Sequence, residues 1–264
     1  MLKSLENKII VITGASSGIG QEMAYQVASL GAKPILLARS EEKLINIVEE
    51  IKRRTSVQAS LYRIDVTNHK QVREVFQKIR KDEGFVDILV NNAGFGVFDF
   101  FLDASLSDLK GMLDVNVLGL MACTKEVLPF MIEQNRGHII NIASQAGKIA
   151  TPKSSGYAAS KHAVLGFTNS LRMELKETNI VVSSVNPGPI KTNFFKIADK
   201  SGDYVNNAEK YMLEASDVAK KITRLMIKPK RELNLPWWMN MGSVLFHLSP
   251  TLFELVSLKY LNKK

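Results

Sequence analysis

The chain has 264 residues, of which 45% are hydrophobic, and this provides enough apolar surface for one large α/β domain or two small ones. Cys123 is the only cysteine, which excludes a disulfide framework and a cysteine-based metal cluster and fits a reducing compartment. The net charge of +9 suits anionic partners such as a phosphorylated cofactor, acidic lipid or nucleic acid, although solubility alone also accounts for it.

Short β-branched runs alternate along the chain with longer segments in which apolar residues recur every three or four positions. The first residues lead directly into such a run without an apolar signal core, so we expect a cytoplasmic protein. The predicted strands cover residues 8–13, 34–38, 60–63, 88–91, 138–142 and 181–186. The predicted helices cover residues 20–30, 41–54, 69–81, 106–134, 156–178 and 215–226. This alternation predicts a single-domain, doubly wound parallel sheet with helices on both faces, whose ligands gather at the carboxyl ends of the strands.

A glycine-rich turn separates the first predicted strand from the first predicted helix, in the sequence VITGASSGIGQEMAYQV. Gly14, Gly18 and Gly20 allow a sharp turn that presents N–H groups and a helix N-terminus to a pyrophosphate. The spacing is G-x-x-x-G-x-G rather than G-x-G-x-x-G, and glycines that serve the turn alone are the alternative interpretation.

The end of the second predicted strand bears on the choice of dinucleotide. An NAD site usually has Asp or Glu there to hold the ribose 2′-hydroxyl, whereas here Ala38 is followed by Arg39. The guanidinium of Arg39 suits a 2′-phosphate and stacking on adenine, so we expect NADP, with NADPH preferred over NADH. The alternative is a solvated arginine followed by a helix cap at Ser40.

Two more strand ends carry polar residues. Asn91 and Asn92 in ILVNNAGFG are able to bond backbone or adenine, and the Ala-Gly pair after them allows a flat ring to approach the chain. By itself this stretch is also an ordinary Asn-Gly turn. Asp65 follows the third strand and is either a binding residue or a cap for the helix that begins near Asn68.

Tyr157 and Lys161 lie four residues apart in a predicted helix, which places the phenol and the ammonium on one face. A nearby cation favours the phenolate, so Lys161 is expected to lower the pKa of Tyr157 toward neutral pH and make it a general acid. Ser144 ends the strand HIINIAS, where its hydroxyl is suited to donate to a developing oxyanion. A substrate carbonyl would lie between these groups.

The motifs together resemble the classical short-chain dehydrogenase/reductase (SDR) family from about residue 8 to residue 192. The resemblance implies a Rossmann-like fold and reversible hydride transfer between a nicotinamide cofactor and a carbonyl carbon, without a metal. His69, His138, His162 and His247 show no metal-ligand spacing, which agrees with that expectation. The motifs that carry the resemblance are TGASSGIG, NNAG, DVNVLG, Ser144, Tyr157-x-x-x-Lys161 and NPGPIKT at 186–192.

The resemblance also implies roles for individual residues. The catalytic set is Asn116, Ser144, Tyr157 and Lys161. Asn116 would hold a water that links Lys161 to solvent, and Lys161 would also bond the nicotinamide ribose. The implied cofactor-binding set is Gly14, Ser16, Ser17, Gly18, Ile19 and Gly20 at the phosphates, Arg39 at the 2′-phosphate, Asp65 and Val66 at adenine, Asn92 at the adjoining ribose with Ala93 and Gly94, then Tyr157, Lys161, Pro187, Gly188, Ile190 and Thr192 around the nicotinamide.

Substrate specificity in this family resembles a property of the stretch corresponding to residues 193–213, together with residues after NNAG and Ser144. The aromatic character of these stretches favours an apolar or ring-containing carbonyl compound. The alternative is that half of these side chains pack against the sheet or a neighbouring subunit. The candidate lining residues are Phe95, Phe98, Gln145, Phe194, Phe195, Tyr211 and Met212.

The C-terminal segment departs from the family pattern, since RELNLPWWMNMGSVLFHLSPTLFELVSLKYLNKK stands where many members have an Asp-Gly-Gly turn. Residues 233–253 contain no Asp, Glu, Lys or Arg, but prolines and polar residues interrupt them, so we reject a transmembrane helix. Ser249 followed by Pro250 predicts the start of a second short helix. We divide the chain into a catalytic domain, 1–235, and an apolar helical extension, 236–264.

Three placements of the extension stay open. It packs against the core or a partner subunit, covers the substrate pocket, or lies in a membrane interface. In the membrane placement, Trp237 and Trp238 lie at headgroup level, and Lys230, Arg231, Lys263 and Lys264 lie on acidic lipid.

The sequence therefore predicts an NADP-dependent oxidoreductase that interconverts a carbonyl and an alcohol on a small-molecule substrate. The alternative is an NADP(H)-binding interaction module with little turnover. Nucleic-acid binding rests on charge alone and is not expected. We expect a homo-oligomer, a dimer or a tetramer, although the missing Asp-Gly-Gly turn is at odds with the commonest tetramer of the family.

Overall fold

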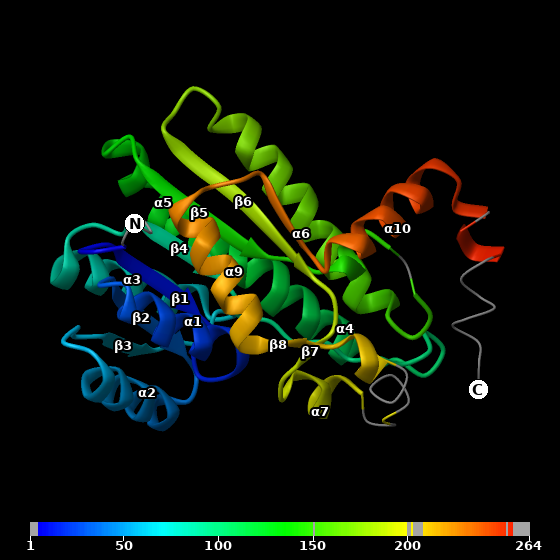
Figure 1. The fold of residues 1–264 in the computed structure, drawn as a ribbon, viewed down its shortest axis with the longest axis horizontal. Helices are drawn as coiled ribbons and strands as arrows, with labels where there is room; N and C mark the ends of the chain where they lie inside the picture. Colours follow the sequence, from blue (N-terminus) through cyan, green and yellow to red (C-terminus); the bar gives the residue numbers. More distant parts are fainter. Residues whose placement is uncertain (1–4, 150, 200–201, 203–207, 252, 256–264) are drawn as a thin grey trace.

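The computed structural model describes residues 5–149, 151–199, 202, 208–251 and 253–255. Within them, one sheet of seven parallel strands has the order β3-β2-β1-β4-β5-β6-β9 (Figure 1). The order reverses between β1 and β4, and ligands of such sheets bind at this switch point. The strands are β1 (Ile9–Thr13), β2 (Lys33–Ala38), β3 (Ser60–Arg63), β4 (Ile88–Asn91), β5 (Gly137–Ile142), β6 (Ile180–Pro187) and β9 (Glu232–Leu235).

Helices cover both faces of the sheet, and strand β1 shows why. Its side chains alternate, so Ile10 and Ile12 pack under one helical layer while Val11 packs under the other. Because both faces are buried, the strand is apolar throughout. The first layer contains α1 (Gly18–Ser29), α2 (Glu41–Arg54) and α9 (Ala215–Ile227), and the second contains α3 (His69–Glu83), α5 (Leu120–Glu133) and α6 (Ser155–Glu174). The predicted single-domain doubly wound fold is confirmed.

The helix predicted over residues 106–134 is interrupted. It consists of α4 (Leu106–Leu113), a π-helical segment (Asp114–Gly119) and α5. A π segment adds one residue to a turn without changing the apolar character of the sequence, so periodicity did not indicate it. The continuous run Leu106–Glu133 is also long and apolar enough to cross a membrane, with a mean hydropathy of 1.4 in its most apolar window, but 44% of that window is buried inside the fold. It packs against α3 and α6 as a core helix does.

Three further features differ from the prediction. Strand β9 was not expected, because its Glu-Leu-Asn-Leu sequence lacks a β-branched residue and the strand is held by backbone pairing with β6. Helix α6 ends at Glu174 rather than at residue 178, because Thr178 turns back to bond the carbonyl of Leu175. The stretch 187–214, expected as loop, contains β7 (Ile190–Lys191), α7 (Phe194–Ala198) and β8 (Leu213–Glu214).

The C-terminal extension begins with α10 (Trp237–Leu248), which follows β9 directly. Because β9 runs parallel to β6, α10 starts at the carboxyl edge of the sheet and stands apart from α1 and α9 (Figure 1). Residues 250, 251 and 253–255 are helical, which confirms a second helix that begins at Pro250, and the Phe253 N–H donates to the carbonyl of Ser249.

Candidate active site

A cavity of about 2420 Å³ opens at the carboxyl edge of the sheet. It extends from the glycine turn after β1, past the ends of β2 and β4, to the loop after β5 and to α10. The predicted site residues come together here, since all of them line the cavity except Gly20 and Asn116.

The glycine turn owes its composition to close backbone approach. Gly14 has φ +64°, and a Cβ on it would lie 2.8 Å from Cα of Ala93 at the end of β4. A Cβ on Gly20 would lie 2.5 Å from the carbonyl oxygen of Gly14, so Gly20 serves helix packing and does not line the cavity. Helix α1 begins at the cavity, and the side chain of its N-cap, Ser17, makes no capping bond. Its first-turn N–H groups are therefore suited to an anion.

Asn91 and Asn92 lock strand ends together. The Asn92 amide donates to the carbonyls of Thr13 (2.9 Å) and Gly14 (3.2 Å), so its nitrogen holds the glycine turn. Asn91 is buried and its amide donates to Thr124 and Asn141, both at 2.9 Å, which makes it a structural residue of the sheet.

The far end of the cavity is lined by Arg39, Lys43 and Asp65. Arg39 is exposed, and the side chain of Ser40 makes no capping bond to α2, so the capping alternative is not what the structure shows. Burial raises the pKa of Asp65, but hydrogen bonds from Thr67 and the charge of Arg39 outweigh it, and the net pKa lies below the usual value. Asn68, not Asp65, caps α3. The sequence reasoning missed Lys43, although its spacing of four from Arg39 was a usable signal.

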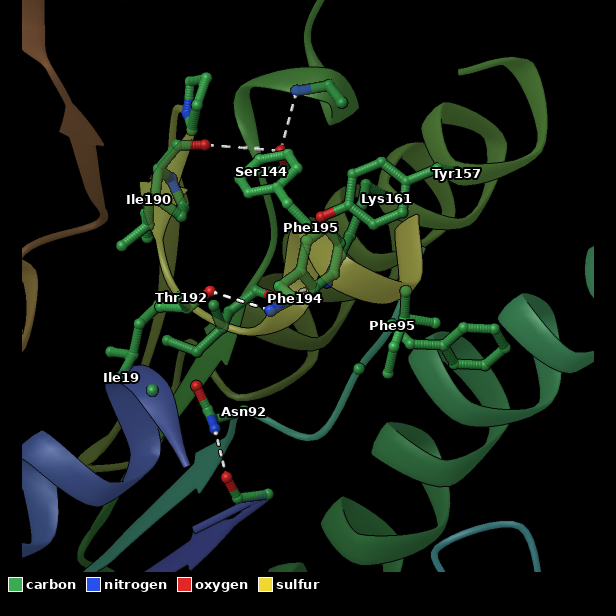
Figure 2. Close-up of a pocket in the computed structure, with 18 of the residues that line it drawn as sticks. Ile19, Asn92, Phe95, Ser144, Tyr157, Lys161, Ile190, Thr192, Phe194 and Phe195 are labelled. Atoms are coloured by element: carbon green, nitrogen blue, oxygen red, sulfur yellow. Dashed lines mark hydrogen bonds between the residues drawn. The ribbon is translucent and has the colours of Figure 1, made fainter. Parts of the chain in front are cut away.

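Ser144, Tyr157 and Lys161 converge on one part of the cavity, and Figure 2 shows the phenol of Tyr157 pointing into it. The Lys161 ammonium donates to the carbonyl of Ile142 at 2.8 Å and lies 5.7 Å from the centroid of the Tyr157 ring. Lys161 is 5% exposed, and its burial lowers its pKa to about 8. The Ser144 hydroxyl accepts from the Ala146 N–H at 3.0 Å and donates to the Pro187 carbonyl over 3.4 Å, a contact long enough to exchange for a better acceptor.

Asn116 lies in the π-helical segment and supports the site from behind. Its amide nitrogen donates to the Phe95 carbonyl (2.9 Å) and to the Ser160 hydroxyl (3.0 Å), and its oxygen accepts from the Phe95 N–H (3.0 Å). The Ser160 hydroxyl donates in turn to the carbonyl of Tyr157. Both amide hydrogens are therefore engaged in fixing the loop after β4 to α6. The water relay that we expected from Asn116 stays a prediction.

An aromatic wall surrounds Tyr157. The Phe98 and Phe194 rings lie 5.6 and 5.7 Å from it, centroid to centroid, and Phe195 packs on Phe98. The predicted lining residues all border the cavity except Met212. The sequence reasoning missed Phe100, Ile149, Trp238, Met239, Gly242 and Phe253, most of them in the C-terminal extension. Of its three open placements, covering the pocket is therefore observed for one face of α10.

The comparisons with known proteins agree with this geometry. A family model described as short chain dehydrogenase matches residues 8–201. An uncharacterized oxidoreductase of Staphylococcus saprophyticus is 36% identical over 225 residues, which are 85% of this chain and 93% of that protein.

Two solved structures share the fold. A short chain dehydrogenase/reductase from Burkholderia phymatum in complex with NAD has a TM-score of 0.87 at 27% identity and covers 94% of this chain and 96% of its own. An actinorhodin polyketide ketoreductase variant with NADPH has a TM-score of 0.80 at 29% identity, covering 87% and 95%.

The sheet order, the glycine turn at its switch point and the Ser, Tyr and Lys side chains around one cavity define an oxidoreductase with a dinucleotide-binding fold. The chain belongs to the short chain dehydrogenase family.

Burial of Lys161 predicts that this residue costs stability. In the unfolded chain its pKa is the ordinary 10.5, against about 8 when folded, so the folded state pays for the buried charge below pH 8 and the cost declines between pH 8 and 10.5. After about 1 kcal/mol for the lost bond to Ile142, Lys161→Met is expected to raise the free energy of unfolding at pH 7 by about 2 kcal/mol, and by less at pH 9.5. Urea unfolding of the cofactor-free protein measures both values.

Lys220→Met, at an exposed position of α9, is the matched control and is expected to change the free energy of unfolding by less than about 0.5 kcal/mol at either pH. A Lys161→Met variant less stable than the wild type at pH 7, or an effect equal at both pH values, contradicts the assignment.

Proposed function

We propose that the protein is an NADP-dependent oxidoreductase that interconverts a carbonyl and an alcohol, with an apolar or ring-containing substrate. The observation that carries the proposal is the convergence of Ser144, Tyr157 and Lys161 on the cavity that also holds the glycine turn. The aromatic wall of that cavity favours the substrate class, because it offers apolar area and few polar partners.

The residues present fit a nicotinamide dinucleotide. The uncapped start of α1 suits the pyrophosphate, and the approach of Gly14 to Ala93 leaves backbone, not side chains, at that wall. The relatives with bound cofactor include one with NAD and one with NADPH, so they leave the choice open. Arg39 and Lys43 at the far end of the cavity support NADP, because two cations there are suited to a 2′-phosphate.

Each residue then has a distinct task. The bound nicotinamide supplies or accepts the hydride, and the protein provides orientation and electrostatics. Tyr157 passes a proton to or from the substrate oxygen. The ammonium of Lys161, anchored on the Ile142 carbonyl, favours the phenolate and so makes this transfer accessible near neutral pH. Ser144 exchanges its long bond to Pro187 for one to the same oxygen.

The alternative, a protein that binds NADP(H) as an interaction module with little turnover, needs none of the last three residues. Their convergence beside the aromatic wall is therefore the argument against it.

Tyr157→Phe tests the reaction. Removing the hydroxyl leaves the ring in its aromatic packing, so NADPH affinity is expected to stay within about threefold, while NADPH oxidation with ketones and aldehydes falls by about 10²- to 10⁴-fold. Tyr62→Phe is the control, because its hydroxyl bonds Asp82 and the residue does not line the cavity. Retained turnover in Tyr157→Phe would sink the proposed mechanism.

Arg39→Ala tests the choice of dinucleotide. If Arg39 bonds the 2′-phosphate, its loss is expected to weaken NADPH binding by about 10- to 100-fold and to leave NADH binding unchanged within about threefold. Arg63→Ala is the control, since Arg63 ends the neighbouring strand in register with Ala38 but does not line the cavity. Fluorescence titrations measure the four affinities, and equal affinity of the wild type for both nucleotides refutes the role of Arg39.

The outward face of α10 supports a further part of the proposal, contact with an acidic lipid surface. Trp237, Met241 and Leu248 are 71%, 63% and 80% exposed and share one helix face. Residues 237–248 contain no Asp, Glu, Lys or Arg, and the net charge of +9 complements acidic lipid. Lys263 and Lys264 lie outside the described residues. The cytoplasmic location and the homo-oligomer stay predictions.

Sedimentation with vesicles tests this contact. The wild type is expected to sediment with phosphatidylglycerol vesicles and less with phosphatidylcholine vesicles. Replacing Trp237, Met241 and Leu248 by Ser removes the apolar face and is expected to lower the partition coefficient at least tenfold. Met173→Ser, at an exposed apolar position of α6, is the control. Binding that the triple variant retains, or no binding by the wild type, contradicts the membrane contact.

A further inference from the structure

Lys148 joins three segments of the chain that are distant in sequence. It follows the 3₁₀ turn Gln145–Gly147, which comes directly after Ser144. Its ammonium donates to the carboxylate of Glu232 in β9 at 2.5 Å and to the side-chain oxygen of Asn240 in α10 at 3.1 Å. One side chain therefore ties the loop of the candidate active site to the last strand and to the C-terminal helix.

The Lys148–Glu232 pair is part of a closed ring of side chains. The Gln145 amide donates to the Asn186 carbonyl, the Asn186 amide donates to Asn234, and the Asn234 amide reaches Glu232 at 3.4 Å. Lys148 closes the ring back to the turn that carries Gln145. Its side chain is 15% exposed and that of Glu232 27%, so the pair is partly shielded from water and stronger than a surface ion pair. Burial opposes ionisation of Glu232, but Lys148 outweighs it and the pKa of Glu232 lies below its usual value.

Helix α10 rests on the candidate site from a second side. A Cβ on Gly188 would lie 2.7 Å from the sulfur of Met239 and 3.4 Å from Cδ of Pro236, so the start of α10 packs on the segment after β6. Trp238, Met239 and Gly242 line the cavity. The inner face of α10 is thus one wall of the substrate space, while its outer face is exposed.

We infer that Lys148 is a positioning residue that fixes α10, through Glu232 and Asn240, as a wall of the substrate cavity, and thereby gives the enzyme its selectivity for large apolar carbonyl compounds over small ones. A substrate large enough to reach from Tyr157 to Trp238 and Met239 gains binding energy from this wall only when the helix is held in place. A small aldehyde does not reach it. The inference rests on the proposed function, because it assigns selectivity to that same site.

Asn240→Leu and Lys148→Met test this assignment. Asn240→Leu cuts the link to α10 but keeps the Lys148–Glu232 pair, and Lys148→Met removes both bonds while keeping the aliphatic stem. For both variants we expect kcat/KM with a two-ring ketone such as 2-decalone to fall roughly tenfold, mainly through KM. With propanal it is expected to change less than about twofold, and NADPH affinity to stay unchanged. Lys148→Arg is expected to restore part of the selectivity.

Lys33→Met is the matched control, because the Lys33–Glu83 pair has the same 2.5 Å distance but lies at the amino end of β2. Equal losses with both substrates, or the same ratio of the two kcat/KM values in Lys33→Met and Lys148→Met, would overturn the inference.

Hydrogen exchange provides a readout that does not depend on activity. In Asn240→Leu and Lys148→Met, amides of residues 237–248 are expected to exchange at least about tenfold faster, with no change in 137–142. Unchanged exchange in 237–248 overturns the positioning role, and faster exchange with an unchanged substrate ratio overturns the role in selectivity. If the wild type reduces no carbonyl compound, the proposed function fails, and the exchange data still decide whether Lys148 positions α10.

Discussion

The structure depends on one buried charge, the ammonium of Lys161. A lysine at 5% exposure is costly, and the fold meets part of the cost with a carbonyl at the last residue of β5. The same burial keeps water away from the phenol beside it, so the electrostatic effect of the ammonium on that phenol is stronger than at a surface. The element that supports the chemistry is therefore the one that weakens the fold, as is usual for functional sites.

The parallel sheet makes this arrangement affordable in geometric terms, because all of its strands end at one edge. Buried polar side chains join these ends: Asn92 holds the turn after β1, Asn91 joins β4 to β5 and α5, and Asn116 joins the loop after β4 to α6. A slip of one strand would leave several of these groups unpaired in the interior. The position of Tyr157 relative to the phosphate turn is thus set by the core and not by flexible loops.

Much of the fold and of the site could be predicted from the sequence, and the reason differs for each part. The buried strands announce themselves because both faces need apolar residues, and Tyr157 and Lys161 because a spacing of four fixes one helix face. The π-helical segment carries no such pattern, and β9 is short, polar at alternate positions and dependent on its partner β6. Asn92 and Gly20 were assigned to the cofactor although close backbone packing already accounts for both, a distinction that composition alone does not make.

The C-terminal helix shows how one apolar segment acquires two different surfaces. An ordinary amphipathic helix turns its apolar side to the core, yet α10 is apolar on both sides: Met239 packs on Gly188, and Trp237 and Met241 face outward. Apolar contact therefore does not select which way the helix faces, since either side would bury comparable area. The polar residue Asn240, bonded to Lys148 within a ring that includes Glu232, breaks this degeneracy, because only one orientation gives it a partner. A polar contact thus specifies the orientation, and the apolar residues on its two sides are left to meet different surroundings.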